Sequence, residues 1–81
     1  MLDFIDTIIK RINDRLILNA KGARIAYVDD MDDTCEYYKT RASEDIRVLA
    51  DITRRLHYAE EMEYLKEYIE NGGTYDGING R

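Results

Sequence analysis

The chain has 81 residues, with 17 acidic and 12 basic side chains and a formal net charge of −5 at pH 7. This length allows one domain with a small core, and the negative charge argues against direct binding to nucleic acid or to an anionic membrane. Cys35 is the only cysteine, which suits a reducing compartment. No apolar run approaches the roughly 20 residues that cross a bilayer. We therefore expect a cytoplasmic protein without a secretory signal or a membrane span.

The first predicted element is a helix from about Phe4 to Ala20. Its apolar residues recur three or four positions apart, and Asp3 is suited to cap its N-terminus. Lys21 and Gly22 form the expected C-terminal signal. A β-hairpin over residues 16–28 is the alternative, because β-branched residues flank a possible turn there.

An acidic cluster follows, with four carboxylates within residues 29–33. They belong to Asp29, Asp30, Asp32 and Asp33. Mutual repulsion of these carboxylates predicts a break in the helical pattern and a new helix from about Thr34. The spacing does not match the EF-hand calcium loop, which needs a glycine at its sixth position and a glutamate at its twelfth. We interpret the cluster as an alternative contact surface for a partner and expect neither a metal nor another cofactor.

The final helix is expected to be the longest, from Glu44 to Glu70, with Ser43 as its N-cap. An unbroken helix over residues 34–71 is a further possibility. Apolar residues form one stripe from Ile46 to Ile69. Because the first helix is too short to cover this stripe, the pattern predicts a homo-oligomer, preferably a dimer, formed through the final helix.

Together these elements predict an all-α fold, either an antiparallel helical hairpin or a three-helix bundle with a long C-terminal helix. Residues 1–73 would form a single helical domain. Residues 74–81 are glycine-rich and are expected to be a flexible tail, although Tyr75 and Ile78 could still dock it against the helices.

No group of residues in the sequence predicts catalysis. Cys35 and His57 lie 22 positions apart, and neither has the neighbouring ligands of a zinc site. A Cys–His catalytic pair would also need a third group to orient the base. We therefore expect no catalytic residue and no metal ligand, and we interpret the chain as a non-enzymatic protein.

Tyrosine is the main aromatic residue, with seven copies beside one phenylalanine and no tryptophan. Its ring provides contact area and its hydroxyl a polar tip, which suits protein interfaces. Five side chains flank the stripe of the predicted final helix: Tyr58, Glu61, Tyr64, Glu67 and Tyr68. We predict that these five bind a protein partner with a basic surface.

The sequence thus favours a small acidic protein that binds and modulates a larger protein, as an inhibitor or adaptor of the kind that phages and bacteria use. One alternative is a structural or assembly component that forms a helical homo-oligomer. Another is a small helical enzyme that acts on an anionic metabolite through basic side chains such as Arg11, Arg15 and Lys39.

Overall fold

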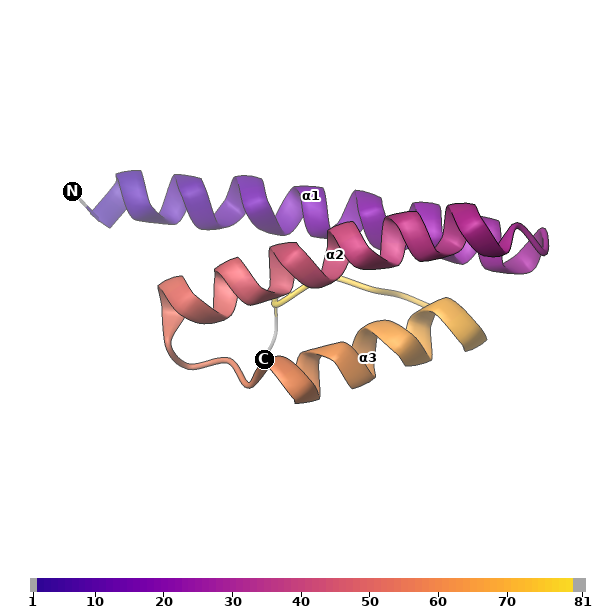
Figure 1. Cartoon of the computed structure of the whole chain (residues 1–81). Coiled ribbons are helices and arrows are strands. Elements are labelled where there is room, and N and C mark those ends of the chain that lie inside the picture. Colours follow the sequence, from indigo (N-terminus) through magenta and orange to yellow (C-terminus); the bar gives the residue numbers. More distant parts are fainter. Residues whose placement is uncertain (1, 80–81) are drawn as a thin grey trace.

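The structure, a computed structural model, describes residues 2–79. Within this range the chain forms three helices and no strand: α1 (Leu2–Val28), α2 (Asp32–Thr53) and α3 (Tyr58–Asn71). Figure 1 shows α1 and α2 as an antiparallel pair, with α3 beneath them. The predicted all-α, three-helix fold is confirmed. None of the described helices combines the length and the apolar character needed to cross a membrane.

The first helix is longer than the sequence predicted. It continues through Gly22 to Val28, so both the helix end near Ala20 and the alternative hairpin over residues 16–28 were wrong. The structure gives Gly22 a different role. A Cβ atom there would lie 3.0 Å from the ring of Tyr38 on α2. Glycine therefore allows the two helices to approach closely and does not end the helix.

The core lies where the three helices meet, and each helix contributes one stripe to it. The fully or almost fully buried residues are Leu16, Ala20 and Ala23 from α1, Ala42, Ile46 and Leu49 from α2, and Leu65 and Ile69 from α3. Burying a large aliphatic side chain stabilises the fold by about 1.5–3 kcal/mol. The predicted stripe from Ile46 to Ile69 is thus buried within the chain, but two helices share it.

The turn between α1 and α2 falls within the acidic cluster, as predicted. Asp30 adopts a left-handed conformation with φ of 58°, which aspartate tolerates better than most residues. The backbone N–H of Met31 donates to the carbonyl of Ala26 at 2.9 Å. The new helix then begins at Asp32, two residues before the predicted Thr34.

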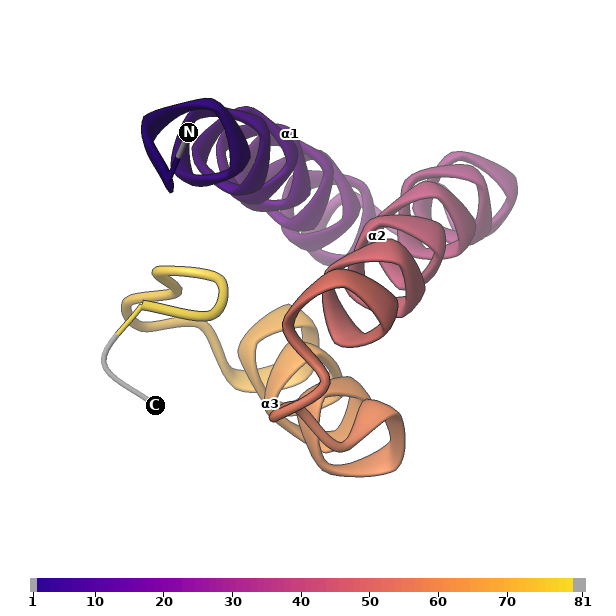
Figure 2. The same ribbon diagram turned by 90° about the vertical axis from the view of Figure 1, so that its left-hand side faces the viewer.

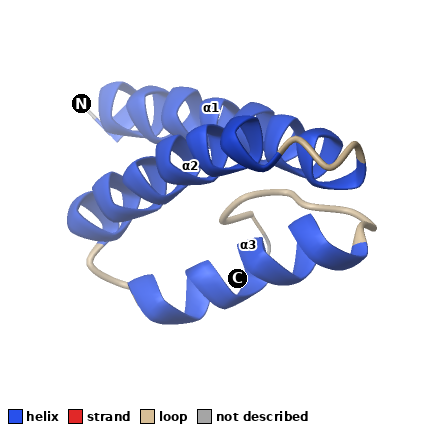
Figure 3. Cartoon of the chain, turned by 45° about the vertical axis from the view of Figure 1, so that its right-hand side comes forward, coloured by secondary structure: helices blue, strands red, loops and turns tan. Residues whose placement is uncertain are grey.

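The predicted long helix from Glu44 to Glu70 is wrong, as is the unbroken alternative over residues 34–71. Helix α2 ends at Thr53, and Arg54 takes a left-handed conformation with φ of 57° as its N–H donates to Ala50 at 2.9 Å. The loop of residues 54–57 then turns the chain back (Figure 3). This turn costs about 1–2 kcal/mol at a residue other than glycine. Burial of α3 against the α1–α2 pair offsets that cost.

The predicted N-cap, Ser43, instead lies inside α2. Its hydroxyl donates to the carbonyl oxygen of Thr40 at 2.7 Å, an arrangement that is compatible with a continuous helix. A serine followed by acidic residues therefore resembled a helix start in the sequence without being one.

Residues 72–79 run back along α1 and occupy the fourth corner of the bundle (Figure 2). The buried side chain of Asn13 anchors them. Its Nδ2 donates to the carbonyl of Asp76 at 3.3 Å, and the N–H of Ile78 donates to its Oδ1 at 2.8 Å. Tyr75 is buried and stacks on Tyr68 with ring centroids 5.3 Å apart. The described part of the tail thus takes the docked arrangement, while the expected flexibility stays a prediction.

Candidate functional site

The third helix is the most acidic element of the structure, with five glutamates and one lysine in 14 residues. Leu65 and Ile69 point into the core, so most of the glutamates remain at the surface. Glu60 and Glu61 stand in the first turn, where the helix dipole favours negative charge. The helix is therefore held by its apolar stripe and presents carboxylates around it.

Tyr64 stands at the centre of this acidic helix between two pockets. Its side chain is 42% exposed, and its hydroxyl donates to Glu60 Oε1 at 3.3 Å. One pocket, here called the Ile78 pocket, has a volume of about 460 Å³. The other, the Tyr75 pocket, has a volume of about 290 Å³. Tyr64 lines both, so a partner that covers its ring would also reach into each pocket. We call this region the Tyr64 surface.

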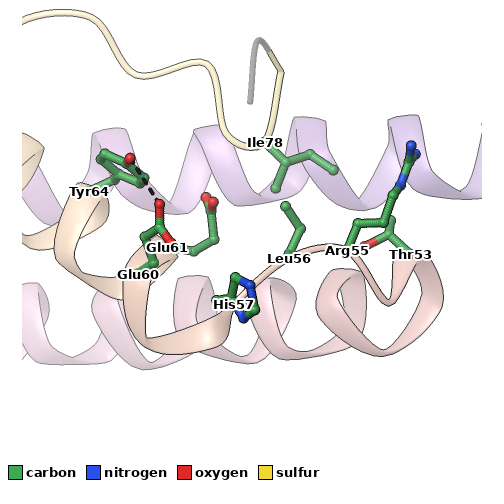
Figure 4. Close-up of a pocket in the computed structure, with 8 residues that line it drawn as sticks. All are labelled: Thr53, Arg55, Leu56, His57, Glu60, Glu61, Tyr64 and Ile78. Carbon is green, nitrogen blue, oxygen red and sulfur yellow. Dashed lines mark hydrogen bonds between the residues drawn. The ribbon is translucent and has the colours of Figure 1, made fainter.

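The Ile78 pocket lies where the α2–α3 loop, the start of α3 and the tail meet (Figure 4). Its lining residues are Thr53, Arg55, Leu56, His57, Glu60, Glu61, Tyr64 and Ile78. Leu56 and Ile78 face each other and provide an apolar wall, and the carboxylate of Glu61 points into the space beside them. Glu61 is only 3% exposed, so its carboxylate is almost withdrawn from bulk water.

The Tyr75 pocket is shallower and lies between α3 and the tail. It is lined by Tyr64, Glu67, Tyr68, Gly72, Thr74 and Tyr75. Three tyrosines and one glutamate surround it, a combination of aromatic area and negative charge that suits a basic or amphipathic side chain.

The structure divides the five predicted contact residues. Tyr64 and Glu67 are exposed, whereas Tyr68 is half-buried under the docked Tyr75. Tyr58 is half-buried beneath the guanidinium of Arg47, which lies 4.2 Å from the ring centroid. Glu61 is buried in the Ile78 pocket. The continuous open face expected from the sequence is therefore wrong, because α2 and the tail cover parts of it.

Sequence reasoning did not place four residues that complete these pockets: Leu56, Thr74, Tyr75 and Ile78. Tyr75 and Ile78 gave a weak signal, because they are bulky apolar residues in a tail that is otherwise glycine-rich and polar. Leu56 was assigned to the stripe of an unbroken helix, and the loop instead directs it towards Ile78.

The acidic cluster lies at the opposite end of α2 from the Ile78 pocket. Asp29, Asp30, Asp32 and Asp33 are all exposed there. Asp32 and Asp33 belong to the first turn of α2, where the dipole stabilises them. Among residues 2–79 no group of three or more histidine, cysteine, aspartate or glutamate side chains is arranged to hold a metal ion.

The basic residues considered for an anionic metabolite lie in different settings. Arg15 Nη2 is 3.2 Å from Asp45 Oδ1, a carboxylate that also accepts from Asn19. Arg11 is exposed on α1. Lys39 lines a third pocket of about 250 Å³ at the far end of the molecule, with Cys35 and several carboxylates among its neighbours. A cationic cradle for an anion does not arise from these three.

Cys35 is half-buried in this third pocket, and its environment raises the pKa of the thiol. The largest cause is burial, followed by repulsion of the thiolate by Glu36; Lys39 opposes the shift, and Asp32 adds to it. A raised pKa leaves less thiolate at neutral pH, and the thiolate is the nucleophile.

We expect the thiol of Cys35 to react with iodoacetamide more slowly at pH 7 than a free thiol such as N-acetylcysteine. The rate-against-pH curve of the folded protein should be displaced to higher pH, and unfolding in urea should abolish the displacement. Mass spectrometry of timed samples measures both curves. A folded-state reaction as fast as that of N-acetylcysteine would contradict this expectation.

Comparison of the chain with protein-family models, with curated proteins and with solved structures gives no match.

Proposed function

We propose that this chain is a small, acidic, non-enzymatic protein that binds and modulates a larger protein, as an inhibitor or adaptor, through the Tyr64 surface. The observation that carries the proposal is the exposed ring of Tyr64 between two pockets, each of which is lined by glutamate. An anchor residue flanked by cavities is the arrangement in which a few contacts supply most of the binding free energy.

The charge of α3 indicates what kind of partner fits. Glu60 and Glu67 are exposed on either side of Tyr64, one turn away in each direction. Such carboxylates attract a basic surface at a distance and accelerate encounter, an effect that salt weakens. The proposed partner is therefore a protein with a basic contact surface.

Capture from lysate with matched variants tests this proposal. Tyr64→Ala should weaken binding of the captured partner by about 1–3 kcal/mol, the range of an interface anchor. Tyr37→Ala is the control, because Tyr37 is also an exposed helical tyrosine but lies on α2. Calorimetric titration at low and high salt then measures the affinity of each variant. Equal affinities for wild type and Tyr64→Ala, with no salt dependence, would contradict the proposal.

A second proposed role is self-association, and exposed apolar residues on α1 and α2 favour it. Leu18 and Ile25 lie seven positions apart on one face of α1, and Tyr37 and Val48 lie on one face of α2. The ion pair of Arg15 and Asp45 links the two helices. This side mixes both charges with apolar residues, so a second copy meets less repulsion here than at the acidic α3. The predicted stripe cannot serve, because the chain buries it.

Analytical ultracentrifugation tests this second proposal. A dimer that forms through α1 and α2 should dissociate in the double variant Leu18→Glu, Ile25→Glu. The control is Thr40→Glu, which adds a carboxylate at an exposed position of α2. A wild-type protein that stays monomeric at about 100 µM, well above common dissociation constants, would contradict the proposal.

A further inference from the structure

We propose that the Ile78 pocket binds the side chain of an arginine carried by the partner. This inference rests on the proposed function and specifies the group that the partner inserts. The pocket volume of about 460 Å³ lies within the range of roughly 300–1,000 Å³ that is typical of ligand sites. It is open on one side, as a pocket must be if a side chain enters from another protein (Figure 4).

The walls of the pocket match the two parts of an arginine side chain. Leu56 and Ile78 form an apolar surface against which the methylene stem can pack. The carboxylates of Glu60 and Glu61, with the hydroxyl of Tyr64, lie on the α3 side. A guanidinium group that enters along the apolar wall therefore arrives at oxygen acceptors.

The burial of Glu61 selects for a cation. A carboxylate that is 3% exposed has lost most of its hydration, and a bound cation with N–H donors replaces it. The pocket also has basic residues at its rim, Arg55 and His57. In Figure 4 the guanidinium of Arg55 points away from Glu61, so it leaves the acidic side open.

The geometry favours arginine over lysine. A guanidinium is planar and offers its N–H groups as a fork, so it can bond one carboxylate with two parallel hydrogen bonds and reach a second acceptor. Glu61 and Glu60 are adjacent residues that present two such carboxylates. An ammonium group is more strongly hydrated and gains less from a site with an apolar wall.

The probe is N-acetyl-L-arginine methylamide, and N-acetyl-L-citrulline methylamide is its uncharged match. Nitrogen-15 NMR titration should show the arginine probe binding with a dissociation constant on the order of 1 mM, as expected for a ligand of this size. The shifts should be confined to amides that line the pocket, among them Leu56, Glu61 and Ile78. The citrulline probe should bind roughly tenfold more weakly or not measurably, because it lacks the charge.

Variants then assign the site. Glu61→Gln and Glu60→Gln should each weaken the arginine probe several-fold, whereas Glu63→Gln, an exposed glutamate of α3 that does not line the pocket, should not. Circular dichroism checks that Glu61→Gln is folded, and Glu60→Gln, which changes an exposed residue, provides the answer if it is not. Arg81→Ala is titrated in parallel, so that the chain's own arginine three positions after Ile78 does not compete with the probe.

Two results would overturn the inference: equal binding of the arginine and citrulline probes, or equal affinity of wild type and both glutamine variants. The result is separable from the proposed function. If the probe does not bind but Tyr64→Ala still abolishes partner capture, the pocket inference alone falls. If the probe binds but Tyr64→Ala leaves capture unchanged, the proposed function falls, and the pocket stands as a site for free guanidinium compounds.

Discussion

Leu16→Ala is expected to lower the free energy of unfolding by about 2–5 kcal/mol, whereas Leu18→Ala is expected to change it by less than about 0.5 kcal/mol. The two leucines are two positions apart on α1, but Leu16 is 0% exposed and Leu18 is 67% exposed. Only the first substitution removes buried carbons and leaves a cavity among α1, α2 and α3. Because a domain of this size has little stability to lose, Leu16→Ala should approach complete unfolding at ambient temperature.

Urea denaturation followed by circular dichroism measures both variants. The Leu18→Ala protein is the control, since it changes the same residue type in the same helix. Equal losses for the two variants would contradict the packing described for α1, and a loss confined to Leu18→Ala would place the opposite face of α1 in the core.

Gly77→Ala is expected to detach the tail and to lower the free energy of unfolding by about 1–3 kcal/mol. Gly77 has φ of +65°, and a Cβ atom there would overlap the side-chain amide of Asn13. That amide forms the two hydrogen bonds that anchor Asp76 and Ile78 to α1. It cannot move aside without breaking them.

Gly73→Ala is the matched control. Gly73 also has a positive φ, but a Cβ atom there would meet nothing within 4 Å, so its substitution introduces backbone strain without a clash. Hydrogen exchange should show faster exchange of the Ile78 amide in Gly77→Ala and unchanged exchange in Gly73→Ala. Similar exchange in the two variants would mean that the contact with Asn13 does not hold the tail.

The sequence predicted those parts of the fold that depend on local interactions. Repulsion among neighbouring carboxylates indicated the turn at residues 29–33, and apolar spacing indicated which residues would be buried. The break at Arg54 could not be predicted in this way, because no glycine or proline marks it. The left-handed conformation of Arg54 is stabilised by the distant packing of α3 on α1. Gly22 was misread for the same reason, since its role depends on Tyr38 in another helix.

The candidate site shows the same division. Tyr64 and Glu67 are exposed on α3, as the helical pattern predicted. The pattern did not predict that Glu61 would be buried or that Tyr75 would cover Tyr68. Both depend on the position of the tail, which Asn13 fixes from more than 60 residues away in the sequence. Such contacts leave almost no signal in a single sequence, so the pockets on either side of Tyr64 became visible only in the structure.

The central claim is that a basic partner binds the Tyr64 surface. Hydrogen exchange of the protein with and without its captured partner tests this claim most directly. We expect slower exchange in α3 and in residues 74–79 on binding, and unchanged exchange in the turn at residues 29–33. Protection confined to the acidic turn, with α3 unaffected, would contradict the claim and would assign the contact to Asp29, Asp30, Asp32 and Asp33.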